Sequence, residues 1–127
     1  MLLAAVLGGV IGFERRPADR PAGSIRTMSL VAIGACLFTI TSMFSFQDGP
    51  MTWDASRVAA AIPSGVGFLG AGLIWKSNSK YLHGLTTAAS VWLSASVGVA
   101  SAGGLYIISI YSVMLIVLVV KFGPKLI

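Results

Sequence analysis

Few residues in this chain could carry out chemistry, and its carboxylates are the first to consider. All four lie in or beside polar segments, at the edges of apolar runs: Glu14, Asp19, Asp48 and Asp54. Mg²⁺ prefers oxygen ligands in octahedral geometry and keeps several of its waters. Asp48 and Asp54 could hold such an ion, but the interpretation with more weight is that both are loop acids and that Asp54 caps the following helix.

The charged residues beside these acids each have more than one interpretation. Glu14 is either a functional carboxylate at a helix end or the partner of Arg15 or Arg26, and the sequence favours neither. Arg57 lies at the start of a glycine-rich run, on a side with few bases. It could pair with either nearby aspartate, extend to the headgroup region, or face an anionic ligand. Pairing is the expected outcome.

The remaining reactive side chains form no catalytic or metal-binding pattern. His83 has no second His or Cys nearby, so we expect no metal role for it. Thr86 and Thr87 either cap the next helix, which is the default, or line a polar cleft. The GxGxxGxG run at 65–72 neither follows a strand nor opens a helix, which excludes a dinucleotide fingerprint. We therefore predict no enzymatic activity and no resident cofactor, and Mg²⁺ remains the one candidate ligand.

The composition indicates where these residues must be positioned, namely in a membrane. The chain of 127 residues is 56% hydrophobic and only 10% charged, whereas about 25% charged residues are typical of soluble domains. Its net charge of +5 comes from bases that lie between apolar segments. Such bases fit anionic lipid headgroups better than nucleic acid, which we do not expect as a partner. We predict an integral, multi-pass protein of the plasma (inner) membrane whose first partner is the lipid bilayer.

Five apolar runs predict an all-α bundle of about five transmembrane helices. The predicted spans are about 1–13, 27–46, 57–75, 85–102 and 105–122. They form a single domain over residues 1–127, with no soluble C-terminal domain expected. Thirteen residues of helix reach about 20 Å, short of a hydrocarbon core of roughly 30 Å. Either this helix lies tilted in thin lipid or further residues precede it, and the second alternative is the one that we expect.

The third run is the one around which we expect the bundle to be built. It contains four glycines within eight positions: Gly65, Gly67, Gly70 and Gly72. In lipid, helices associate through close backbone approach, which small residues permit. Ala60, Ser64, Gly67 and Ala71 fall on one helical face, and Ala61, Gly65 and Gly72 fall on the adjacent one. Two such faces predict a buried central helix with tight packing, and also a homodimer.

The other long runs differ in the surroundings that they predict. The fourth is rich in Ala, Ser and Thr around Trp92, so we expect it to be buried against neighbours as well. The second half of the fifth is bulky and aliphatic, which predicts a peripheral helix that faces lipid. Eight of the nine Lys and Arg residues fall on one side of a five-span topology, and Arg57 falls on the other. The positive-inside rule then places the N-terminus outside and the C-terminus in the cytosol.

These residues together resemble the MgtC/SapB family of membrane proteins. The similarity covers about residues 8–105 and departs from the family pattern at Ala61, at Pro63 and in the spacing around Ser24. The matching stretches are Gly8-Gly9 to Gly12-Phe13-Glu14-Arg15, Pro21-Ala22-Gly23, Arg26-Thr27, Ser56-Arg57-Val58-Ala59-Ala60, residues 64–72 and residues 84–92.

The resemblance implies an inner-membrane protein linked to growth in low magnesium and, in pathogens, to survival inside host cells. Members of the family are often described as magnesium transporters, but no carboxylate here lies at mid-membrane depth, where cation transporters usually need one. We therefore expect a regulatory or interaction protein that binds other membrane proteins, and the alternative is a transporter or channel for Mg²⁺ or another ion. The candidate functional residues are Glu14, Arg15, Arg26, Thr27, Arg57, Gly65, Gly67, Gly70, Gly72, Thr86, Thr87 and Trp92.

Overall fold

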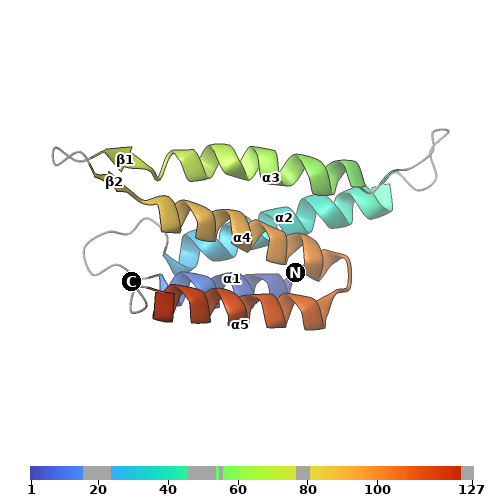
Figure 1. Ribbon diagram of the computed structural model, residues 1–127. Helices are drawn as coiled ribbons and strands as arrows, with labels where there is room; N and C mark the ends of the chain where they lie inside the picture. The colour runs from blue at the N-terminus through green and yellow to red at the C-terminus, as the bar shows by residue number, and fades with distance from the viewer. Residues whose placement is uncertain (16–23, 46–53, 55, 77–80, 124–127) are drawn as a thin grey trace.

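Five helices and one short hairpin make up the fold, as a computed structural model shows for residues 1–15, 24–45, 54, 56–76 and 81–123 (Figure 1). The predicted all-α class is confirmed. The elements are α1 (Leu2–Glu14), α2 (Ile25–Ser45), α3 (Ser56–Ala71), β1 (Trp75–Lys76), β2 (Leu82–His83), α4 (Leu85–Ala102) and α5 (Tyr106–Phe122).

The hairpin between α3 and α4 was not predicted. The helix α3 ends at Ala71 instead of Trp75, and its last turn is followed by tighter bonds from the Leu73 and Ile74 amides to carbonyls three residues earlier. β1 then pairs with β2 in antiparallel register, with Trp75 opposite His83, and the two rings stack with centroids 5.5 Å apart. Two-residue strands are too short for an alternating pattern to reveal them in the sequence.

Close packing of α1 and α4 against α2 forms the centre of the bundle. Gly8 of α1 lies against α2 so tightly that a methyl group there would come within 2.6 Å of the Met28 carbonyl oxygen. Gly98 of α4 lies equally close to α2, where a methyl group on it would collide with the Ala32 carbonyl. The Ser94 hydroxyl of α4 donates a hydrogen bond of 2.7 Å to the Met28 carbonyl. These contacts bury one face of α4 against its neighbours, as predicted, and place α4 rather than the third run at the centre.

The apolar core is shared by four helices, and α5 closes one side of it. α5 packs on α1 and α4, where Val113 is buried, while most of its bulky residues are exposed. The prediction that α5 is peripheral is confirmed. The main buried cluster comprises Leu7, Ile11, Met28, Val91, Val97 and Val113.

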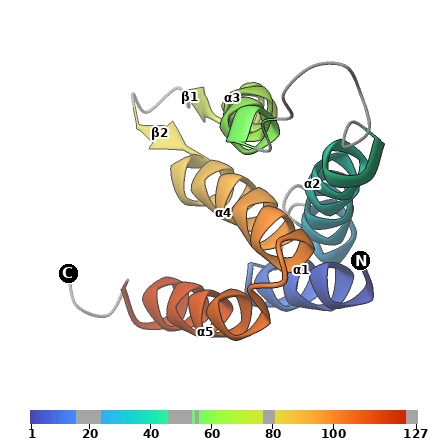
Figure 2. The ribbon, with the colours of Figure 1, turned by 90° about the vertical axis from the view of Figure 1, so that its right-hand side faces the viewer.

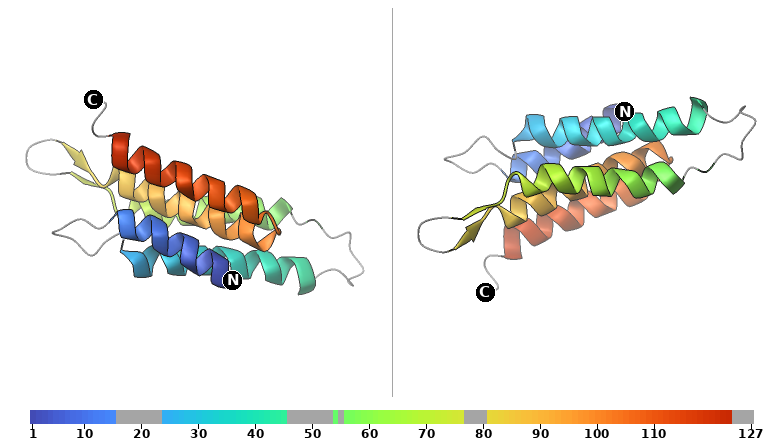
Figure 3. Two further views of the ribbon diagram at one scale, coloured as in Figure 1. Left: turned by 90° about the horizontal axis from the view of Figure 1, so that it is seen from below. Right: turned by 90° about the horizontal axis from the view of Figure 1, so that it is seen from above.

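The prediction that the glycine-rich helix occupies the centre is wrong. α3 lies on the outside, beside α4 and α2 (Figure 2) and on the face opposite α5 (Figure 3). Of its described residues only Gly70 is buried, and a methyl group on Gly65 or Gly67 would meet nothing within 4 Å. Small residues show that a helix can be approached closely, but not that the approaching helix belongs to the same chain.

Two of the helices are long and apolar enough to cross a bilayer, judged by length and composition over the described residues. They are Ile25–Phe44 within α2 and Leu85–Ala102, which is α4. Leu2–Glu14 and Tyr106–Phe122 are apolar but shorter, and α3 has 16 residues. The five predicted helices are therefore present, with lengths that differ from the predicted spans mainly in α3.

Candidate functional site

One polar site joins the end of α1 to the start of α4. Arg15 follows the last residue of α1, and its Nη2 donates a hydrogen bond of 2.7 Å to the Thr87 hydroxyl, 72 positions away. The close approach of α1 to α2, where Gly12 lies against the backbone of Ile25, helps to position Arg15. Arg15 and Thr87 were both predicted from the sequence as candidate functional residues, and the structure brings them into contact.

Arg15 is held in partly desolvated surroundings. Its Nε is buried and has no hydrogen-bond partner in the structure, and Arg15 is not otherwise tied to a carboxylate within the described ranges. Burial lowers the pKa of the Arg15 guanidinium, which nevertheless stays charged near neutrality because an arginine pKa lies so high. Its position at the C-terminal end of α1 is favourable, since the helix dipole is negative there.

The capping role expected of Thr86 and Thr87 is wrong. Gly84 is the N-cap of α4, with a φ of 90° and no side-chain capping bond. Thr87 instead accepts the Arg15 hydrogen bond, and the Thr86 carbonyl accepts a bond of 2.8 Å from the Ser90 hydroxyl. A side chain at position 84 would collide with the Leu73 carbonyl, so glycine is required there for reasons of both space and backbone angle.

The other candidates at this end are less constrained. Glu14 is half-buried, and neither predicted pairing, with Arg15 or with Arg26, occurs in the part of the chain that the structure describes. Arg26 is exposed. Thr27 lies 3.4 Å from the Ser24 hydroxyl, oxygen to oxygen.

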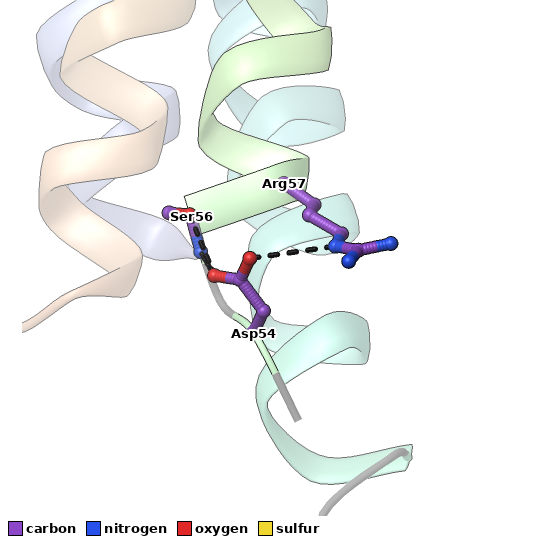
Figure 4. Close-up of polar contacts among 3 residues, drawn as sticks. All are labelled: Asp54, Ser56 and Arg57. Atoms are coloured by element: carbon purple, nitrogen blue, oxygen red, sulfur yellow. Dashed lines mark hydrogen bonds and ion pairs between the residues drawn. The ribbon is translucent and has the colours of Figure 1, made fainter. Parts of the chain in front are cut away.

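A second polar site lies at the opposite end of the bundle, where α3 begins. The Asp54 carboxylate accepts hydrogen bonds from the amide and hydroxyl of Ser56, at 3.0 and 2.6 Å, and pairs with the Arg57 Nε at 3.4 Å (Figure 4). The predicted capping by Asp54 and its pairing with Arg57 are both confirmed. The Ser56 hydroxyl and amide, followed by Arg57, lower the pKa of Asp54. The pair is exposed to solvent, 84% for the Arg57 side chain.

A groove between α2 and α3 was missed in the sequence. It has a volume of about 890 Å³ and is lined almost entirely by apolar side chains, with Arg57 at one end. Apolar residues on two neighbouring helices predict contact between those helices, so no pattern in the sequence indicates a groove between α2 and α3. Its lining includes Val31, Gly34 and Phe38 from α2, and Val58, Ala61, Gly65 and Leu69 from α3.

The candidate glycines of α3 have different surroundings. Gly70 faces α4, where a methyl group would make an ordinary contact of 3.4 Å with the Ala88 carbonyl oxygen. Gly65 faces the groove, while Gly67 and Gly72 are exposed. Trp92 of α4, expected to be buried, is 47% exposed, because α4 turns its serine and alanine face to α2.

The described residues contain no group of three His, Cys, Asp or Glu side chains that could hold a metal ion. Asp19 and Asp48 lie outside the ranges that the structure describes, so the predicted alternative of a magnesium site at Asp48 and Asp54 stays a prediction. Glu14 is the last residue of α1, and Asp54 precedes the first residue of α3. The end of α1 and the start of α3 lie at opposite ends of the bundle (Figure 1), so the two acids are far apart.

Comparison with known proteins decides the family. The model of the MgtC family matches residues 1–127, the whole chain. The chain belongs to the MgtC family. No solved structure matches it.

Curated members of the MgtC family share a third to a half of their aligned residues with this chain. "Putative magnesium transporter YhiD" of Escherichia coli is 39% identical over 99% of the chain and 60% of its own length. "Protein MgtC" of Brucella abortus is 50% identical over 80% of the chain and 40% of its own length. "Protein SapB" of Bacillus subtilis is 36% identical over 96% of the chain and 54% of its own length. The chain thus spans about half the length of these relatives.

The stretches that resemble the MgtC family have distinct structural roles. The first, in α1, supplies Gly8 and Gly12 for packing against α2 and supplies Arg15. The one at the start of α4 supplies Gly84 and Thr87. Residues 64–72, which form the second half of α3 and the residue after it, lie largely exposed. Two of these stretches therefore build the bundle, while the third faces outward.

Proposed function

We propose that this chain is a multi-pass protein of the plasma membrane that takes part in adaptation to low magnesium by binding other membrane helices. The link to magnesium is supported by membership of the MgtC family and by the name of the E. coli relative. The membrane location is supported by the two helices of sufficient length and by the low charge content.

The outward face of α3 is the observation that carries the proposal. Ala60, Ser64, Gly67 and Ala71 recur at helical spacing, and all four are exposed. A face of small residues gains little by facing lipid alone, because it offers few atoms for dispersion contacts. It allows another helix to approach to backbone distance, where weak contacts and interhelical hydrogen bonds accumulate. The partner is a second copy of the chain, as the predicted homodimer requires, or a different membrane protein.

Cross-linking from within native membranes tests this face. A photoactivatable probe attached at Gly67→Cys should give a discrete protein adduct whose mass identifies a second copy or another protein. The matched control is Ile107→Cys, at a position that is 84% exposed on α5, the helix on the opposite side of the bundle from α3. Ile107→Cys should label lipid alone. Indistinguishable patterns from the two positions would contradict the proposal.

The interior of the bundle supports an interaction role over conduction. Its buried hydroxyls are used for internal hydrogen bonds: Ser94 donates to the Met28 carbonyl at 2.7 Å, and Ser109 donates to the Leu105 carbonyl at 2.9 Å. A path for ions through a membrane protein needs polar groups that face water or the ion. Both hydroxyls are buried within the bundle, so they do not line a path that is open to water.

The distribution of bases supports an orientation. Arg15, Arg26, Lys76 and Lys121 lie near the ends of α1, α2, β1 and α5 that meet at one end of the bundle, and Arg57 lies at the other (Figure 3). We infer that the end at which these four described bases lie faces the cytosol, with the N-terminus outside.

Transport of Mg²⁺ is the second candidate, favoured by the name given to the E. coli relative. Purified chain in liposomes loaded with a magnesium indicator separates the two proposals. Influx above that of protein-free liposomes, abolished by Glu14→Ala or Arg57→Ala, would refute a purely regulatory role. Absence of influx, together with a protein adduct at position 67, would refute transport.

A further inference from the structure

We propose that the groove between α2 and α3 binds one acyl chain of a membrane phospholipid, whose phosphate is held by Arg57. The inference goes beyond the partner-binding role of α3 and rests on the membrane location alone. It uses a different face of α3, since Gly65 lines the groove and Gly67 does not.

The groove has open walls where a chain of methylene groups would lie. Gly34 on α2 and Gly65 on α3 both line it, and a methyl group added to either would meet nothing within 4 Å. With about 890 Å³ of space, the groove falls within the range of roughly 300–1,000 Å³ found for small-molecule sites. An apolar space of this size, open along its side to lipid, favours a flexible apolar occupant.

The length of the groove corresponds to one leaflet of a bilayer. On α3 it runs from Arg57 to Leu69, twelve residues, or about 18 Å at the rise of an α-helix. Half of a hydrocarbon core of roughly 30 Å is about 15 Å. An acyl chain that starts at the membrane surface beside Arg57 would therefore end near Leu69, at the depth where acyl chains normally end.

The polarity of the groove matches an amphiphile in one orientation. The polar lining residues Thr41, Ser42 and Arg57 gather at one end, because α2 and α3 run antiparallel and the end of one meets the start of the other. The opposite end is lined by aliphatic side chains such as Leu30, Val66 and Leu69. A phospholipid presents the same order, with a charged head followed by an apolar chain.

Arg57 is arranged to bind an anionic group. Asp54 engages its Nε at 3.4 Å, and the guanidinium extends from there to the side away from Asp54 (Figure 4). A guanidinium binds phosphate oxygens through two parallel hydrogen bonds. Asp54 thus engages only the Nε edge of the Arg57 guanidinium.

Native mass spectrometry of the full chain, purified from membranes in mild detergent, tests the inference. The wild-type chain should retain one phospholipid per chain. Gly65→Leu, which fills the groove, should abolish retention, and Arg57→Gln should weaken it roughly tenfold, the loss of about one charge-assisted hydrogen bond. The matched controls are Gly67→Leu, on another face of α3, and Arg26→Gln, an exposed arginine on α2; both should retain the lipid.

Three results would overturn the inference. The first is that Gly65→Leu retains as much phospholipid as the wild type. The second is that Gly65→Leu and Gly67→Leu lose phospholipid equally. The third is a lipid-free dimer that Gly65→Leu dissociates, which would assign the groove to a second copy. Alkaline extraction separates the two proposals. A chain washed out of membranes refutes the membrane location itself, whereas an embedded chain that retains no phospholipid refutes the groove inference alone.

Discussion

Replacement of Gly98 by alanine is the sharpest test of the bundle's centre. The added methyl group would collide with the backbone carbonyl of Ala32 on α2, an atom that cannot turn aside as a side chain does. Overpacking of this kind costs roughly 1–3 kcal/mol. Because the obstacle is backbone, and the neighbouring Ser94 to Met28 hydrogen bond depends on the same helix separation, we expect a loss of about 3 kcal/mol.

The assay is equilibrium unfolding in mixed micelles, followed by circular dichroism as a denaturing detergent is titrated. Gly67→Ala is the matched control, since its methyl group would meet nothing within 4 Å. Alanine is a better helix former than glycine, so the control should be unchanged or up to about 1 kcal/mol more stable. If Gly98→Ala is as stable as the wild type, or if both variants lose stability equally, the placement of α4 inside and α3 outside is wrong.

Three further predictions concern single hydrogen bonds and charges. Thr87→Val removes the acceptor of the Arg15 bond and should cost about 1 kcal/mol in the same assay; no loss would mean that the bond contributes nothing. Ser94→Ala should cost about 1 kcal/mol, because the α4 to α2 bond at Met28 is lost, and a neutral result would count against that contact. The pKa of Asp54 is lowered in the folded chain, so its contribution is present above its unfolded pKa of about 3.9 and is lost as the pH falls through the folded value. Protection of the amides at the start of α3 from hydrogen exchange, taken relative to the intrinsic exchange rate at each pH, should therefore fall at low pH, and Asp54→Asn should remove this pH dependence.

The sequence predicted the helices well because each is a long apolar run bounded by polar segments. It also predicted the Asp54 cap, since an aspartate just before an apolar helical run is a preferred capping residue. Arg15 and Thr87 were both named as candidates, but their contact spans 72 positions and depends on how α1 and α4 pack. Local patterns contain no information on such a pairing.

The position of α3 could not be predicted, because glycine content measures how closely a helix can be approached and says nothing of which helix approaches it. In α1 and α4, Gly8 and Gly98 meet α2 of the same chain. In α3, a methyl group on Gly65 or Gly67 would meet no other described part of the chain within 4 Å. The groove escaped prediction for a related reason, since the residues that line it have the composition of a core.

Growth in low magnesium tests the central claim, that the outward face of α3 carries the function. A strain deleted for its own copy would be supplied with the wild-type chain, with Gly67→Leu, or with Gly123→Leu, whose added side chain at the end of α5 also begins in open space. Membrane abundance of each would be measured in parallel. We predict that Gly67→Leu fails to support growth at normal abundance while Gly123→Leu supports it. Growth equal to wild type with Gly67→Leu would contradict the claim.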